Sequence, residues 1–219
     1  MFSRCDPSTS GLEDIDNWKD TDRDSAISLP AFLEKSHRAD KYVIAGHWPV
    51  INYPSNVPAH NPFIDHNKKI IAIDGGNTIK TSGQLNAFII QRTSSEDLFS
   101  YTYVDHLPSC KVLEDFQANP VMTGSITYPH FDVNPVEKGD NFTLCKQPQT
   151  NRLLYVKNEY LKQNETGSCT VTTDLSCTQL SVKKGDIVSI ADDSCEGYTM
   201  IKKDGAVGWV MKEVLRKSS

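Results

Sequence analysis

The stretch "YVIAGHWPVINY" (42–53) begins with apolar residues, reaches Gly46 and His47, and is then broken by Trp48-Pro49. β-Branched and aromatic residues before a glycine and a proline indicate a buried strand over 41–46 that ends abruptly. A strand that ends in this way places His47 at its tip. This histidine is therefore the first candidate functional residue.

A second stretch, "IIAIDGGNTIKTSGQLNAFII" (70–90), has the same organisation. An apolar strand over 69–74 ends in a glycine-bearing loop, and another strand begins near Gln84. Neighbouring loops at one edge of a sheet are where layered α/β enzymes place their sites, and glycines there let the backbone approach a bound group. We expect a cleft beside His47 to be shaped by Gly46, Trp48, Asp74, Gly75 and Gly76.

Two further strands are expected at "QLNAFIIQ" (84–91) and "FSYTYVD" (99–105). The strands at 41–46, 69–74 and 84–91 are almost continuously apolar at their centres, which is typical of a sheet covered on both faces. The strand at 99–105 alternates between aromatic and polar residues, which is typical of an edge strand.

The composition excludes several classes of protein. The 219 residues carry a net charge of −5, with basic residues scattered among acidic ones, which argues against a nucleic-acid partner. No apolar run is long enough to span a membrane, and the polar, acidic N-terminus does not have the pattern of a signal peptide. We therefore expect a cytoplasmic protein, without a membrane partner, whose six cysteines are reduced.

The chain divides into an acidic, irregular segment over 1–26 and two larger regions over 27–107 and 108–219. The segment "SLPAFLEKSHRADK" predicts a short helix with Ser28 as its N-cap and a proline in the first turn. Together with the strands that follow, this helix predicts an α+β fold.

The region 108–219 contains two approximate copies of a small β unit. "VEKGDNFTLCK" (136–146) matches "VKKGDIVSIAD" (182–192), and "LLYVKNEYL" (153–161) matches "VGWVMKEVL" (207–215). The second copy is longer, and the extra length fits a hairpin around Asp204-Gly205. A Gly-Asp turn before one strand and a later Gly-Trp-Val strand resemble an SH3-like barrel, a fold reused for many functions.

Residues 38–92 resemble a known enzyme family. The segments "VIAGHWPV", "IDGGN" and "GQLNAFII", with "NPFID" (61–65) between them, are similar to the C-terminal portion of the calcineurin-like metallophosphoesterases. The resemblance is to the phosphoprotein-phosphatase branch, which also holds the symmetric dinucleoside tetraphosphatases, and extends more loosely over 110–215 to bacterial members with an SH3-like tail. It implies a partial metallophosphoesterase β-sandwich sheet followed by an SH3-like all-β domain.

In this family the histidine of the Gly-His segment binds one ion of a two-metal centre, so the resemblance assigns a metal-ligand role to His47. The two cations hold the phosphoryl group and lower the pKa of a bound water. A neutral imidazole suits Mn, Fe or Zn. The resemblance gives Asp74 no metal role, and we expect its carboxylate to tie down the glycine turn that follows.

The family's other ligand segments, Asp-x-His, Gly-Asp-x-x-Asp-Arg-Gly and Gly-Asn-His-Asp/Glu, do not occur in this sequence. One imidazole cannot hold two hydrated cations, so we expect the chain alone to bind no metal stably and to be inactive. An alternative metal cluster is His60, Asp65 and His66 in "HNPFIDH", which is also compatible with a polar connection between strands.

Two functions follow. The chain is the C-terminal part of a metal-dependent phosphoesterase that hydrolyses phosphomonoesters, truncated or completed by a separate chain, or it is a non-catalytic binding or scaffold module. The first function leaves apolar faces and edges of the strands at 41–46 and 69–74 uncovered, so self-association is expected. The second would use aromatic residues of the SH3-like region: Tyr155, Tyr160, Tyr198 and Trp209.

Overall fold

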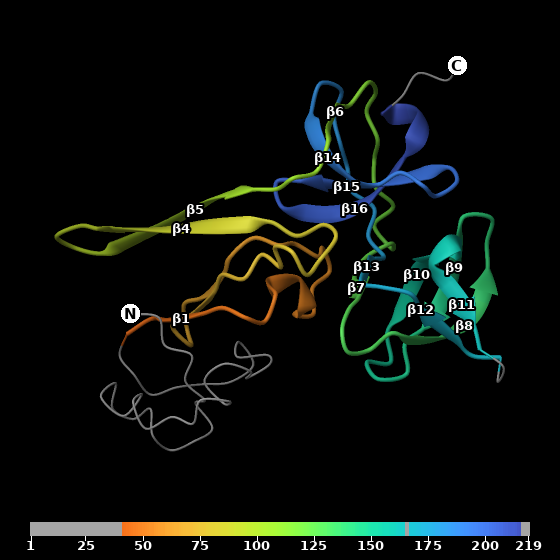
Figure 1. Cartoon of the computed structure of the whole chain (residues 1–219), viewed down its shortest axis with the longest axis horizontal. Coiled ribbons are helices and arrows are strands. Elements are labelled where there is room, and N and C mark those ends of the chain that lie inside the picture. The colour runs from red at the N-terminus through yellow and green to blue at the C-terminus, as the bar shows by residue number, and fades with distance from the viewer. Residues whose placement is uncertain (1–40, 165–166, 216–219) are drawn as a thin grey trace. The chain divides into compact units, whose positions relative to one another are not determined.

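The computed structural model describes residues 41–164 and 167–215, whose strands are labelled in Figure 1. The acidic segment predicted over 1–26, the helix predicted to begin at Ser28, and Cys5 lie outside the described residues. Within the described part of the chain, no helix is long and apolar enough to cross a membrane.

The predicted α+β class is wrong, because the structure is almost entirely β. Strands make up 46% of it, and no helix over 41–164 and 167–215 reaches seven residues. The predicted helix rested on the segment from Ser28, whereas the described sequence combines β-branched and aromatic residues with turn formers. Its helical turns are short 3₁₀ elements: η4 (Val50–Asn52), η5 (Asn158–Tyr160) and η6 (Lys212–Val214).

The chain forms two compact units, and each is described by itself. Unit 1 comprises, among the described residues, 41–53, 60–79 and 83–105. Unit 2 comprises the remainder, including the short stretches 54–59 and 80–82. The main change from unit 1 to unit 2 follows Asp105, close to the predicted boundary after residue 107.

Unit 1 contains a three-stranded sheet in the order β1-β3-β2. Its strands are β1 (Val43–Ala45), β2 (Phe63–Asp65) and β3 (Ile70–Ala72). β1 and β3 run parallel, with Ala45 opposite Ala72, so the two strands end at the same edge. Ile70 and Ile71, whose side chains point to opposite faces, are both fully buried, which confirms the predicted covering of this strand.

Unit 1 also contains a two-stranded antiparallel ribbon of β4 (Leu85–Arg92) and β5 (Asp97–Val104). The two strands pair without interruption over their whole length. The prediction that β4 is covered on both faces is wrong, because its one strand partner among the described residues is β5 and most of its side chains are exposed. The expectation of exposed apolar faces on β1 and β3 is also wrong, because these faces occur on the ribbon instead.

Unit 2 contains a five-stranded sheet in the order β10-β9-β8-β12-β11. Each strand is antiparallel to its neighbours. Its strands are β8 (Asp132–Lys138), β9 (Phe142–Lys146), β10 (Leu153–Lys157), β11 (Leu161–Gln163) and β12 (Cys169–Val171).

A four-stranded sheet of unit 2 has the order β16-β15-β14-β6. Its strands are β6 (Ser109–Lys111), β14 (Ile187–Asp192), β15 (Tyr198–Lys203) and β16 (Ala206–Met211). β6 precedes the five-stranded sheet in sequence but pairs with β14, which follows it. The five-stranded sheet is therefore an insertion within the four-stranded one.

Two short strands, β7 (Ser125–Ile126) and β13 (Leu175–Ser176), pair with each other at the two ends of this insertion. The core beside the four-stranded sheet gathers residues from both sides of the insertion. Its buried members are Val112, Val182, Val188, Ile201, Val210, Val214 and Leu215.

The two sequence copies correspond to matching local structures. A Gly-Asp pair precedes β9 in the first copy and β14 in the second, and β10 and β16 each run directly into a 3₁₀ turn. The extra length of the second copy is β15 and its hairpin with β16. Asp204 and Gly205 both have positive φ, 50° and 78°, which confirms the predicted two-residue turn. The SH3-like resemblance itself stays a prediction.

The location of the core predicts that two isoleucines of the four-stranded sheet contribute differently to stability. Ile201→Ala removes a fully buried side chain and should lower the free energy of unfolding by about 2–5 kcal/mol. Ile187→Ala, in the neighbouring strand but 64% exposed, should change it by less than about 0.5 kcal/mol. Urea unfolding of both variants measures the difference, and equal losses would contradict this placement of the core.

Candidate functional site

The two loops that the sequence singled out meet at one edge of the sheet in unit 1. The backbone N–H of Ile73 donates to the carbonyl of Ala45 at 3.0 Å, and that of Val50 donates to the carbonyl of Asp74 at 2.8 Å. Parallel pairing of β1 and β3 therefore continues into the loops that follow them. The Gly-His loop and the Asp-Gly-Gly loop lie side by side, as predicted.

His47 is exposed at this edge and has a φ of 75°, in the left-handed region. Such a backbone conformation costs a non-glycine residue on the order of 1–3 kcal/mol and is found where the surroundings enforce it, often at functional sites. Trp48 packs against Val50, Tyr53 and Ala72, which anchors the loop on the side after the histidine. The loop is thus held in place while the imidazole is accessible.

The contacts of the Asp-Gly-Gly loop show why an aspartate and two glycines occur there. The carboxylate of Asp74 accepts a hydrogen bond from the N–H of Gly76 at 2.8 Å, which confirms that it ties down the glycine turn. A Cβ on Gly75 would lie 2.2 Å from the carbonyl oxygen of Gln84, so no larger residue fits there. Gly76 has a φ of 69° and bridges to Gln84. By contrast, nothing lies within 4 Å of a Cβ built on Gly46.

A network of side-chain amides, which was not predicted from the sequence, fixes the start of the Asp-Gly-Gly loop relative to the start of the ribbon. Gln84 is fully buried, and its amide nitrogen donates to the side-chain oxygens of Asn61 at 3.1 Å and Asn86 at 2.7 Å. The Asn86 amide donates in turn to the carbonyls of His60 at 2.8 Å and Ile73 at 3.0 Å. In the sequence, this network could have been suspected from the amide residues Gln84 and Asn86, which stand at the start of an otherwise apolar strand.

The alternative metal cluster is not brought together. His60 is fully buried, whereas His66 is exposed. The carboxylate of Asp65 accepts a hydrogen bond from the N–H of Lys68 at 2.8 Å, as in a tight turn. Nδ1 of His66 lies 2.8 Å from the hydroxyl of Tyr42. These contacts fit the second interpretation of this segment, a polar connection between two strands.

The residues that the structure describes do not make up a metal centre by themselves. Over 41–164 and 167–215, no group of three His, Cys, Asp or Glu side chains is placed to hold a metal ion. A cation bound by His47 would therefore need ligands from outside these residues. The edge offers one accessible imidazole next to a rigid loop.

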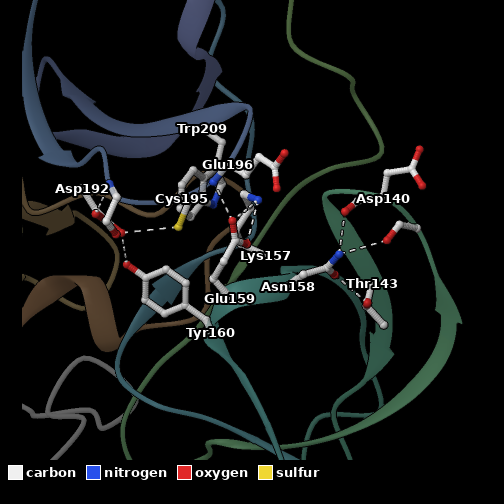
Figure 2. Close-up of polar contacts among 12 residues, drawn as sticks. Asp140, Thr143, Lys157, Asn158, Glu159, Tyr160, Asp192, Cys195, Glu196 and Trp209 are labelled. Carbon is white, nitrogen blue, oxygen red and sulfur yellow. Dashed lines mark hydrogen bonds and ion pairs between the residues drawn. The ribbon is translucent and has the colours of Figure 1, made fainter.

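Unit 2 holds a second polar cluster, between its five-stranded and four-stranded sheets (Figure 2). Lys157, at the end of β10, has a side chain only 1% exposed, and its ammonium donates to both oxygens of Glu159 at 2.9 and 2.7 Å. The same ammonium lies 5.4 Å from the centre of the Phe142 ring. Glu159 also accepts the backbone N–H of Glu196 at 2.6 Å, which links the two sheets.

A second link joins the same two sheets. The hydroxyl of Tyr160 donates to the carboxylate of Asp192 at 2.5 Å, and the thiol of Cys195 lies 3.6 Å from the same oxygen. The other oxygen of Asp192 accepts the N–H of Ser194 at 2.8 Å. Figure 2 shows that these side chains all point toward one another.

Asn158 holds the Gly-Asp turn of the first copy. Its amide nitrogen donates to the carbonyls of Gly139 and Asp140, both at 2.9 Å, and its side-chain oxygen accepts the hydroxyl of Thr143 at 2.7 Å. A residue of η5 therefore satisfies a turn that comes almost twenty positions earlier. This contact gives a structural reason for the asparagine after "LLYVK".

Both carboxylates of the cluster ionise more readily than usual. Burial opposes ionisation of Asp192, but hydrogen bonds from Tyr160, Ser194 and Cys195 outweigh it, and its pKa is lowered. Burial likewise opposes ionisation of Glu159, while Lys157 and the N–H of Glu196 lower its pKa. The two carboxylates are therefore anionic at neutral pH and act as hydrogen-bond acceptors between the sheets.

Three thiols of unit 2, those of Cys145, Cys177 and Cys195, are poor nucleophiles because their pKa values are raised. Burial, with the nearby charge of Asp192, raises the pKa of Cys195 to about 11, and burial raises the pKa of Cys145 to about 12. Burial also raises the pKa of Cys177. The thiolate is the nucleophilic form, so a raised pKa lowers the reactivity of these thiols at neutral pH. The cluster in Figure 2 thus joins two sheets through hydrogen bonds and an ion pair.

Three of the four aromatic residues proposed for ligand binding lie within this junction. Trp209 is fully buried, and its indole N–H donates to the carbonyl of Ser176 at 2.7 Å. The Tyr160 ring packs edge-on against Trp209, and Tyr198 packs edge-on against Phe142. Tyr155, in β10, is half-buried.

No family model, curated protein or solved structure matches this chain. The assignment of function therefore rests on the geometry above and on the sequence motifs.

The two glycines at the edge of unit 1 form a matched pair for mutation. Gly75→Ala should lower the free energy of unfolding by about 1–3 kcal/mol or more, because the added methyl overlaps the carbonyl of Gln84. Gly46→Ala meets open space and should be neutral or slightly stabilising. Denaturant unfolding followed by tryptophan fluorescence distinguishes the two, and a harmless Gly75→Ala would contradict the described loop.

Acid should weaken the junction in unit 2. A carboxyl whose pKa is lower in the folded than in the unfolded chain stabilises the fold at neutral pH, and this contribution is lost as the pH falls. The urea midpoint should therefore drop between pH 7 and about pH 3, and drop less in Asp192→Asn, where no charge can be lost. Asp132→Asn, at an exposed position, is the control and should behave like the unmodified chain.

Proposed function

We propose that this chain is the C-terminal part of a metal-dependent phosphoesterase, in which His47 is one ligand of a metal centre completed by additional polypeptide. The observation that carries this proposal is the position of His47 in unit 1. The exposed imidazole lies where two parallel strands end side by side, in a strained loop held by Trp48 and by the Asp74 turn.

Three features support a role beyond structure for this edge. The left-handed backbone of His47 costs free energy that a solvent-exposed loop would ordinarily relax. Gly75 has no room for a side chain, so the loop next to the histidine is fixed in position. The buried amide of Gln84 and the half-buried amide of Asn86 add a rigid support, which is what a metal ligand needs if it is to be preorganised.

The cofactor in this proposal is a divalent cation, Mn, Fe or Zn, since imidazole nitrogen suits these ions. The remaining ligands would come from a separate chain or from polypeptide outside the described residues. The cellular location that we propose is the cytoplasm, which is supported by the free thiols of the cysteines in the described part of the chain. A role as a binding or scaffold module is less well supported, because Trp209, Tyr160 and Tyr198 pack inside unit 2.

The first test measures phosphatase activity of the chain alone. Purified chain with Mn²⁺ should hydrolyse p-nitrophenyl phosphate no faster than buffer with Mn²⁺, and His47→Ala should not differ from it. Turnover above the buffer rate that disappears in His47→Ala would mean that the chain already holds a complete centre.

The second test asks whether His47 is the residue that meets a cation. Mn²⁺ added to labelled chain should broaden the imidazole resonances of His47 at lower concentration than those of His106, which is also exposed. Equal broadening would remove the argument for a metal ligand at this edge. If a polypeptide with the Asp-x-His and Gly-Asn-His-Glu segments is co-expressed, Mn²⁺-dependent hydrolysis should appear and should be lost in His47→Ala.

A further inference from the structure

The inner face of the four-stranded sheet in unit 2 extends beyond the core. Residues that are directly opposite each other in antiparallel strands place their side chains on the same face of the sheet. Cys110 is opposite Val188, and Thr199 is opposite Val210. Because Val188 and Val210 belong to the buried core, Cys110 and Thr199 are on the same face of the sheet as that core.

A pocket lies on this face, and we call it the Thr199 pocket. Its volume is about 280 Å³, which is larger than the roughly 150 Å³ that holds one benzene molecule in a protein interior. The residues that line it all belong to unit 2. They include Pro108, Cys110, Ile190, Asp193, Thr199 and Leu215.

Two features of the backbone interrupt the sheet beside this pocket. Regular pairing of β6 with β14 ends at Ser109, and the residue before it is Pro108, which has no N–H to donate. On the other side of β14, the pairing with β15 shifts in register between Ile190 and Asp192, which is a β-bulge. Bulges are frequent next to functional sites, because they bend a strand and redirect its side chains.

The hydroxyl of Thr199 is the polar group that the fold leaves unused. This residue is only 3% exposed, yet in the part of the chain that the structure describes its hydroxyl has no hydrogen-bond partner. Two other buried threonines differ from it. The hydroxyl of Thr143 donates to the side-chain oxygen of Asn158 at 2.7 Å, and that of Thr178 lies 2.9 and 3.0 Å from two backbone carbonyls. Buried polar groups are normally paired, so an unpaired hydroxyl in a pocket wall indicates a bonding point for a ligand.

The other walls of the pocket favour an uncharged ligand. Ile190 and Leu215 are apolar, and the half-buried thiol of Cys110 lies 3.6 Å from the carbonyl oxygen of Leu215. Asp193 is the charged residue among those named, and its backbone carbonyl accepts the ammonium of Lys212 at 2.5 Å. An acidic and a basic residue are therefore in contact at the pocket, which gives neither sign of charge an advantage.

We propose that the Thr199 pocket binds a small uncharged organic molecule. Its ring or branched chain packs against Ile190 and Leu215, and its one polar group bonds with the Thr199 hydroxyl. The volume of about 280 Å³ admits one ring with a short substituent. Apolar walls with a few placed polar groups are the usual composition of small-molecule sites. No residue of the edge that carries His47 takes part, so the proposal stands independently of the proposed function.

Methyl NMR of the full chain locates the binding, with phenol as the probe. Phenol should shift the methyl resonances of Ile190 and Leu215 in a saturable manner. Two isoleucines are the controls and should shift far less. Ile187 is in the same strand as Ile190 but is 64% exposed, and Ile89 is an exposed residue of the ribbon in unit 1.

Two probes of the same shape test the role of the hydroxyl. Phenol carries a hydroxyl where toluene carries a methyl group, and Thr199→Val makes the same exchange in the protein. The ratio of the phenol Kd to the toluene Kd should rise about fivefold or more in Thr199→Val, because one hydrogen bond is lost. Thr199→Ser keeps the hydroxyl and should preserve the ratio, as should Thr172→Val at an exposed position of unit 2.

Alkylation of Cys110 gives a readout that needs no variant. Saturating phenol should slow the reaction of iodoacetamide with the Cys110 thiol several-fold, because the ligand covers that wall of the pocket. Mass spectrometry of the peptide that contains Cys110 measures the rate. Glutathione in the same solution is the control and should react at an unchanged rate.

Each of several results would overturn the proposal. If phenol shifts neither Ile190 nor Leu215, the pocket holds water only. If it shifts Ile187 or Ile89 as much as Ile190, phenol adsorbs to exposed apolar surface and not to the pocket. An unchanged Kd ratio in Thr199→Val, or an unchanged rate of alkylation of Cys110, would also contradict binding at this place.

Discussion

The side chain of Asn86 connects the parts of unit 1 on which the candidate site depends. Its amide donates to two backbone carbonyls, one after β3 and one before β2, while its oxygen accepts from the buried amide of Gln84. Several hydrogen bonds from one half-buried side chain restrict the arrangement of the backbone segments that it joins. Backbone hydrogen bonds between the ends of β1 and β3 extend this constraint to the Gly-His loop and the Asp-Gly-Gly loop.

A different kind of contact organises unit 2. The two sheets are joined by carboxylates, Glu159 and Asp192, that each accept hydrogen bonds from the other sheet or from η5. Aromatic rings of Phe142, Tyr160 and Trp209 pack around these groups. The junction is therefore apolar at its centre and ionic at its margin. Residues that look suited to ligand binding in the sequence are used here to hold the chain together.

Local features of the fold were predictable from sequence, and long-range partners were not. The positions of β1, β3, β4 and β5, the Asp204-Gly205 turn and the role of Asp74 follow from periodicity and turn chemistry. These signals depend on neighbours in sequence. The covering of β4 and the insertion between β6 and β14 depend on residues far apart, which local patterns do not encode.

The candidate site was predictable only in part for the same reason. The sequence indicates His47, Gly75 and Gly76 because a strand end and a glycine loop are local features. It does not indicate that Gln84 and Asn86 brace the loop, because an amide in an apolar strand has many possible partners. The role of Glu159 was missed in the same way, because the backbone N–H of Glu196 that it binds lies 37 residues further along the chain.

The order of strands in unit 2 has a consequence for how the protein is made. β6 leaves the ribosome early, but its one strand partner among the described residues, β14, begins at Ile187. During translation the nascent chain holds a strand with unpaired edges for the time needed to synthesise the whole five-stranded sheet. That sheet, being continuous in sequence, closes first, and the four-stranded sheet is assembled around its two ends near the completion of synthesis.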